Sequence, residues 1–177
     1  MAPKMIAGFS RGLLLGLLAL LFAGCGGSNQ SAASKKSAYL ETLRADWSSY
    51  STELSKVSAA CPVPTPTLKT MHRCKLRTLA LIKVNETVID DLGNNDPPSK
   101  LQKPVGVLTR SLADLDDAMT TVIRRYIDRN DVAGFQTSGG PGSPIDNGIE
   151  GANAAVADID RLEPDAKLSP TVFVPPS

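Results

Sequence analysis

Apolar residues recur along this chain at alternating spacings of three and four, which is the repeat of a helix that buries one stripe of side chains. Two series of this kind run without a slip, one near residue 50 and one after residue 100. The first is Leu40, Leu43, Trp47, Tyr50, Leu54, Val57 and Cys61. The other is Leu101, Val105, Leu108, Leu112, Leu115, Met119, Val122 and Tyr126. Each series predicts a helix that packs on its neighbours at a shallow angle.

Two further series predict a second and a fourth helix. Between the regular series lie Met71, Cys74, Thr78, Leu81, Asn85, Val88 and Leu92. After Ser143-Pro144, a favourable start for a helix, come Ile145, Ile149, Ala152, Val156 and Ile159. Proline- and glycine-rich segments (CPVPTPT, GNNDPPS and AGFQTSGGPGSP) separate the four helices. Short connections make neighbouring helices antiparallel, so we expect an all-α domain over residues 37–163, an up-down-up-down four-helix bundle. Residues 164–177 hold four prolines and are expected to form a loose extended tail, although 171–174 (TVFV) have the composition to dock on the helices.

The N-terminal apolar stretch is too short to cross a membrane. The 13 residues from Gly12 to Gly24 span about 20 Å as a helix, against about 30 Å of hydrocarbon. Lys4 and Arg11 precede the stretch and small residues close it, as in a cleaved targeting segment.

The end of this stretch carries a more specific motif. Ala23, Gly24 and Cys25 resemble the lipobox of the bacterial lipoprotein signal class, although Phe22 stands where leucine is usual. The resemblance implies that residues 1–24 are removed and that Cys25 becomes a lipidated N-terminus. Residues 25–36 would then be a flexible tether, with the domain outside the cytoplasm on the cell membrane or outer membrane. The alternative is an ordinary secretory signal.

The other two cysteines then form a candidate pair. With Cys25 alkylated, Cys61 and Cys74 remain, and an export compartment permits a disulfide between them. Two free thiols are the alternative. A bond would set the register of the first two helices and place the phenol of Tyr50 beside the amide of Asn85. We interpret Asn85 as a buried polar residue that fixes this register; the alternative is a contact to a ligand inside the bundle.

No catalytic or cofactor motif emerges. A haem site would have to use the single histidine, His72, with Met119, but His72 points about 160° away from its helix's apolar stripe. No Gly-x-Ser-x-Gly motif lies within the predicted domain, and the adjacent acidic pairs do not converge on one atom. We therefore predict no cofactor, no metal and no enzymatic activity.

Charge gives the sharpest functional hypothesis. Removal of Lys4 and Arg11 with the signal leaves 17 of the 19 basic residues against 18 acidic ones, which argues against nucleic-acid binding. Basic residues nevertheless gather where the second helix begins and the third ends: Lys69, Arg73, Arg77, Arg124, Arg125 and Arg129. We expect them to form an exposed patch distal to the anchor that binds an anionic envelope polymer or protein, so that the protein is a partner-binding or scaffolding module. The alternative function is a small-ligand or b-type haem carrier.

Overall fold

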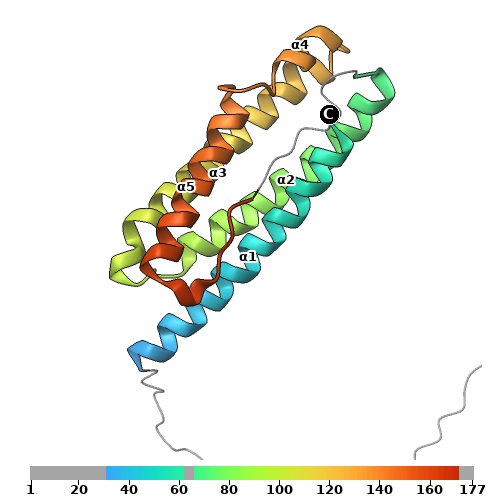
Figure 1. Cartoon of the computed structure of the whole chain (residues 1–177). Coiled ribbons are helices and arrows are strands. Elements are labelled where there is room, and N and C mark those ends of the chain that lie inside the picture. Colours follow the sequence, from blue (N-terminus) through green and yellow to red (C-terminus); the bar gives the residue numbers. More distant parts are fainter. Residues whose placement is uncertain (1–30, 62–65, 172–177) are drawn as a thin grey trace, which may run out of the picture. The chain divides into compact units, whose positions relative to one another are not determined.

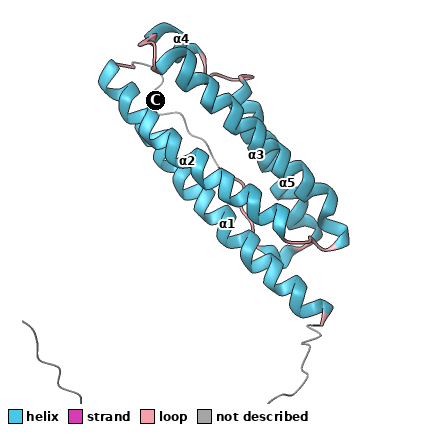
Figure 2. Ribbon diagram, turned by 180° about the vertical axis from the view of Figure 1, so that it is seen from behind, coloured by secondary structure: helices cyan, strands magenta, loops and turns pink. Residues whose placement is uncertain are grey.

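The computed structural model of the chain describes residues 31–61 and 66–171, and this part is all-α, with no strand in it (Figures 1 and 2). The predicted signal, Cys25 and residues 26–30 of the predicted tether lie outside the described residues. Five α-helices follow one another: α1 (Ala32–Ala60), α2 (Leu68–Asn94), α3 (Gln102–Val122), α4 (Val132–Thr137) and α5 (Pro144–Leu162). Two 3-10 helices, η1 (Ser99–Leu101) and η3 (Pro164–Ala166), and a π-helix, η2 (Ile123–Ile127), complete the described elements.

Four of the five α-helices, all except α3, begin at a side chain that accepts a hydrogen bond from the first turn. Ser143 caps α5 and Pro144 is its first residue, as predicted. Ser31 caps α1 in the same way, so α1 starts at Ala32. The predicted tether therefore extends too far, because residues 32–36 are helical. The other difference is α4, a short helix within the predicted third connection. Asp131 caps this helix, and Phe135 is its buried residue.

The predicted apolar stripes form the core. Every member of the stripes on α1 and α2 is buried, including the polar Thr78 and Asn85. Helix α1 packs on α2, α2 on α3, and α3 on α5. The stripe on α5 is buried from Ile149 to Ile159, and Ile145 is partly buried at its start.

The prediction is wrong at the end of the third helix. Ile123 and Ile127 are buried there, whereas Val122 and Tyr126 are only partly buried. The cause is η2, in which the amide of Asp128 donates to the carbonyl of Ile123, five residues earlier. A π-turn holds one residue more than an α-turn, so the side that faces the core moves on by one residue.

Helices α3 and α5 approach closely because α5 presents glycines to α3. A Cβ atom added at Gly148 would lie 2.9 Å from Cβ of Leu115 and 3.1 Å from its Cα. Gly151 lies one turn further along and faces Ser111 in the same way. Glycine therefore sets the distance between these two helices.

The segment after α5 is docked on the helices rather than loose, which corrects the prediction for residues 164–171. Here η3 packs against both α1 and α5, which are not themselves a closely packed pair. Ala166 and Leu168 are buried. Arg44 of α1 donates to the carbonyl oxygen of Ala166, and Nε1 of Trp47 donates to that of Ser169 at 2.7 Å. Figure 1 shows this red segment running between α1 and α5.

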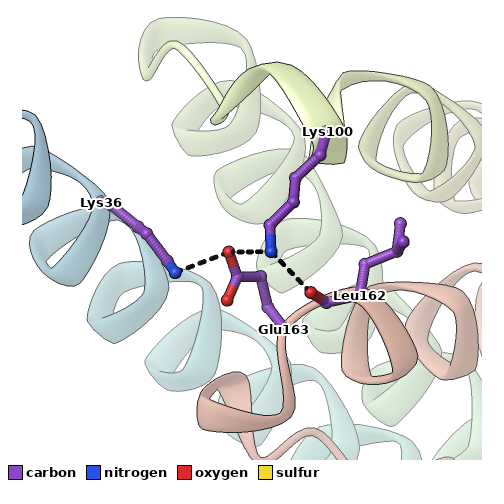
Figure 3. Close-up of polar contacts among 4 residues, drawn as sticks. All are labelled: Lys36, Lys100, Leu162 and Glu163. Atoms are coloured by element: carbon purple, nitrogen blue, oxygen red, sulfur yellow. Dashed lines mark hydrogen bonds and ion pairs between the residues drawn. The ribbon is translucent and has the colours of Figure 1, made fainter.

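An ion-pair cluster fixes the end of the helices at which α1 begins (Figure 3). Oε1 of Glu163, a buried side chain at the end of α5, lies 2.7 Å from Nζ of Lys36 and 2.8 Å from Nζ of Lys100. Lys100 also donates to the carbonyl of Leu162. The two lysines hold the pKa of Glu163 below its usual value. Lys36 thus belongs to the folded domain and not to the predicted tether.

Candidate functional site

The predicted Cys61–Cys74 disulfide is present and joins the end of α1 to the second turn of α2. The Cα atoms of the two cysteines are 4.8 Å apart. Both cysteines are buried and lie on the apolar stripes of their helices, as the spacing predicts. The disulfide marks the end of the helices opposite Ser31, and we call it the disulfide end.

The six basic residues of the predicted patch are all exposed and lie on two elements. Lys69, Arg73 and Arg77 are on α2, while Arg124, Arg125 and Arg129 lie on or directly after η2. Nζ of Lys75 lies 2.6 Å from Oδ1 of Asp128 and so ties the start of α2 to the residue that follows η2. Both groups of basic residues therefore lie at the disulfide end.

Carboxylates neutralise part of this charge. Arg77 lies 4.0 Å from Glu53 of α1, and Arg125 lines a groove of about 510 Å³ together with Asp114 and Asp117. In residues 31–61 and 66–171, no ion pair forms at Arg125 or at the other four members of the patch. These four are Lys69, Arg73, Arg124 and Arg129.

A partly open apolar cleft of about 60 Å³ lies behind the disulfide, and sequence reasoning missed it. All of α1 to α5 and η2 contribute to its wall or to its edge. Six of its lining residues are Leu54, Val57, Leu81, Met119, Phe135 and Ile149. In the sequence, five of these residues belong to the apolar stripes of the predicted helices and are expected in any core. Phe135 lies outside these stripes, and it is the one feature of the sequence that could have pointed to the cleft.

Asn85 has a different partner from the one the register suggested. The side chain of Asn85 is fully buried, and its Nδ2 donates to Oδ1 of Asp116 on α3 at 2.9 Å. Burial raises the pKa of Asp116 to about 6, although the bond from Asn85 opposes this shift. Burial and the charge of Asp116 also raise the pKa of Tyr50, which keeps the phenol neutral. This contact between α2 and α3 supports the structural interpretation of Asn85.

A second pair of groups with shifted pKa values lies on α1. Burial raises the pKa of Asp46 to about 6, and Asp91 of α2 adds to the shift. Burial likewise raises the pKa of Tyr39 to about 12, with a smaller contribution from Asp46. Because burial in the fold causes these shifts, the ionisation of Asp46 and Tyr39 is coupled to the free energy of folding.

The structure does not bring the haem-type pair together. His72 is exposed, in agreement with its predicted direction, whereas Met119 is buried and lines the cleft. In the described ranges, no three His, Cys, Asp or Glu side chains gather where they could hold a metal ion.

Comparisons with protein-family models, with curated proteins and with solved structures find no match to this chain. Of the helices that the structure describes, none combines the length and the apolar character needed to cross a membrane.

Proposed function

We propose that this protein is a lipid-anchored, non-catalytic helical module of the bacterial envelope that binds an anionic partner at its disulfide end. In this proposal α1, α2, α3 and α5 form an up-down-up-down four-helix bundle, which agrees with the packing of each of these helices on the next. Cys25 carries the lipid, and the domain lies on the extracytoplasmic side of the cell membrane or outer membrane.

The observation that carries the proposal is the position of the basic residues that lack a carboxylate partner in the described part of the chain. Lys69, Arg73, Arg124 and Arg129 lie at the end of the domain that is farthest from Ser31. Helix α1 has 29 residues and is therefore about 43 Å long. A charge at that distance is screened from the anchoring membrane, because the Debye length is about 8 Å at physiological salt. A partner other than the protein's own membrane then suits these residues best, either a polyanionic wall polymer or an acidic protein.

Charge reversal tests the partner-binding proposal. Arg73, Arg124 and Arg129 are changed together to glutamate in the full chain, and binding to isolated cell-wall and envelope fractions is measured at several salt concentrations. We expect weaker binding and a smaller salt dependence, with unchanged helicity. The matched control changes Lys83, Lys103 and Arg110, three exposed basic residues elsewhere, to glutamate. If both triple variants lose the same binding, net charge alone is responsible and the proposed surface is wrong.

Metabolic labelling tests the anchor separately. Palmitate label should enter the protein, and Cys25→Ser should abolish it and leave the precursor uncleaved. Label that persists in Cys25→Ser contradicts lipidation at this residue, while the partner-binding proposal stands or falls on the charge variants.

The alternative function, a carrier of haem or another small ligand, has less support. The cleft of about 60 Å³ is far smaller than the roughly 300–1,000 Å³ of a typical site for a small-molecule ligand or cofactor. The exposed His72 supplies no ligand to a haem inside the helices.

A further inference from the structure

The docked segment after α5 runs antiparallel to α5 in an extended conformation. The amide of Leu168 donates to Oδ1 of Asp160, and three residues later Thr171 is bonded to Asn153. Three extended residues advance about 10 Å, and the seven helical residues between Asp160 and Asn153 also span about 10 Å. The segment therefore stays alongside α5 as it runs toward the start of that helix.

The same segment runs parallel to α1 on its other side. Arg44 binds the carbonyl oxygens of Asp165 and Ala166, and Trp47 binds that of Ser169. Leu54 is the second stripe residue of α1 beyond Trp47, and it lines the apolar cleft. The described chain thus ends at Thr171 while it is directed toward the cleft.

The next residues are long enough to reach the cleft. Two more extended residues advance about 6.6 Å, and the four helical residues from Asn153 to Ile149 span about 6 Å. Ile149 lines the cleft. The side-chain hydroxyl of Thr171 bonds to Asn153, and side chains two residues apart on an extended chain share a face. An extended continuation of the chain would therefore place the side chain of residue 173 on the same side as that of Thr171, facing the helices.

We propose that residues 172–174 occupy the apolar cleft and that Phe173 is the side chain that anchors them there. The chemistry is complementary, because the cleft is lined mainly by apolar side chains and the sequence after Thr171 reads Val-Phe-Val. Burial of an aromatic side chain is the largest apolar gain available to this terminus. Pro175 and Pro176 follow, and their lack of amide donors ends any extended pairing.

This occupant changes what the cleft does. A cleft filled by the protein's own C-terminus is an intramolecular docking site that closes the gap between α1 and α5, and not a ligand site. The inference is independent of the lipid anchor and of the basic residues. Two other occupants, the C-terminus of a second copy and a small apolar ligand, are outcomes of the test.

Photo-cross-linking tests the position of Phe173 in the full chain. Benzoylphenylalanine replaces Phe173, the purified protein is irradiated, and the linked peptides are identified by mass spectrometry. We expect links within one chain to peptides that contain Leu54 or Ile149. Links between two chains would assign the cleft to a second copy, and links to other segments or none at all would also overturn the proposal.

A stability measurement gives an independent check. Phe173→Ala should lower the equilibrium constant for folding by about tenfold or more and increase the fluorescence of an added apolar dye. Ser177→Ala, which leaves the apolar run intact, should do neither. Equal behaviour of Phe173→Ala and the parent protein means that the side chain is not docked. Dye binding by the parent protein as strong as that of Phe173→Ala means that the cleft is open to small apolar molecules.

Discussion

Asn153 holds Thr171 by three hydrogen bonds, although the two residues are 18 positions apart. Nδ2 of Asn153 donates to the carbonyl of Thr171 at 2.8 Å, and Oδ1 accepts from its amide at 2.8 Å and from its hydroxyl at 3.0 Å. A side-chain amide used in this way replaces the neighbouring strand that an extended segment otherwise needs. Asn153 is thus the point at which α5 secures the end of the docked segment.

Asn153→Ala is expected to lower the free energy of unfolding by about 1–3 kcal/mol, because two backbone groups of Thr171 lose their partner. The single tryptophan, Trp47, reports on the same segment because its indole donates to Ser169. Its emission should shift to longer wavelength as the segment loosens. Urea unfolding followed by this fluorescence measures both effects. Asn147→Ala, the same change at an exposed position of α5, is the control and should leave the emission unchanged.

The docked segment also shows which kind of contact cannot be predicted from the sequence. Arg44 and Trp47 bind it through the carbonyl oxygens of Asp165, Ala166 and Ser169, which any residue type presents. Composition alone therefore predicts a loose tail. The stripes on α1 and α2 were predicted in full because burial repeats with the helix period, which is a local property of the sequence.

The polar contacts between helices could likewise be predicted only in part from the sequence. Asp116 stands next to Asp117 and reads as part of a solvated face, yet it accepts a hydrogen bond from the buried Asn85. The predicted exposure of the basic residues is correct, but their pairing is not visible in the sequence. Lys75, for example, meets Asp128 from 53 residues away. Contacts between helices depend on the rotation of each helix, and η2 changes that rotation near the disulfide end.

Loss of the disulfide is expected to reduce stability without removing the fold. Cys61 and Cys74 are 13 positions apart, and closing a loop of this size contributes about 3 kcal/mol in the chain-entropy model. Cys61→Ser combined with Cys74→Ser should therefore lower the urea midpoint while the circular dichroism stays helical. A reducing agent should lower the midpoint of the parent protein to that of the double variant and leave the variant unaffected. A parent protein that is insensitive to reduction would show that the bond contributes nothing to stability.

Stability is expected to fall as the pH rises from about 4 to about 7. The pKa of Asp116 is about 6 in the folded protein against an ordinary value of 3.8, and that of Asp46 is shifted alike. The folded state then binds more protons than the unfolded state between these values, so each carboxyl contributes stability below pH 4 that is lost as the pH rises through 6. Glu163 acts in the opposite sense, because its lowered pKa gives stability above pH 4.5 that is lost on acidification.

Asp116→Asn isolates one part of this dependence. The amide keeps an oxygen that accepts the bond from Asn85 but does not ionise. The variant should gain about 1 kcal/mol at pH 7.5 relative to the parent and little at pH 4.5; the gain is modest because the carboxyl is partly exposed. Urea unfolding at both pH values measures the difference. Asp117→Asn, at the exposed neighbour, is the control, and an equal gain in both variants would point to net charge rather than to burial.

The close approach of α3 and α5 predicts opposite effects of one substitution at two glycines. Gly148→Ala places a methyl group 2.9 Å from Cβ of Leu115 and 3.1 Å from its Cα, so the two helices must separate. Overpacking of this kind costs about 1–3 kcal/mol. Gly106→Ala on α3 meets nothing within 4 Å, and alanine there should stabilise the helix by about 0.5–1 kcal/mol. Thermal unfolding of the two variants should therefore show midpoints on opposite sides of the parent's. If Gly148→Ala is as stable as Gly106→Ala, α3 and α5 are not in the close contact described above.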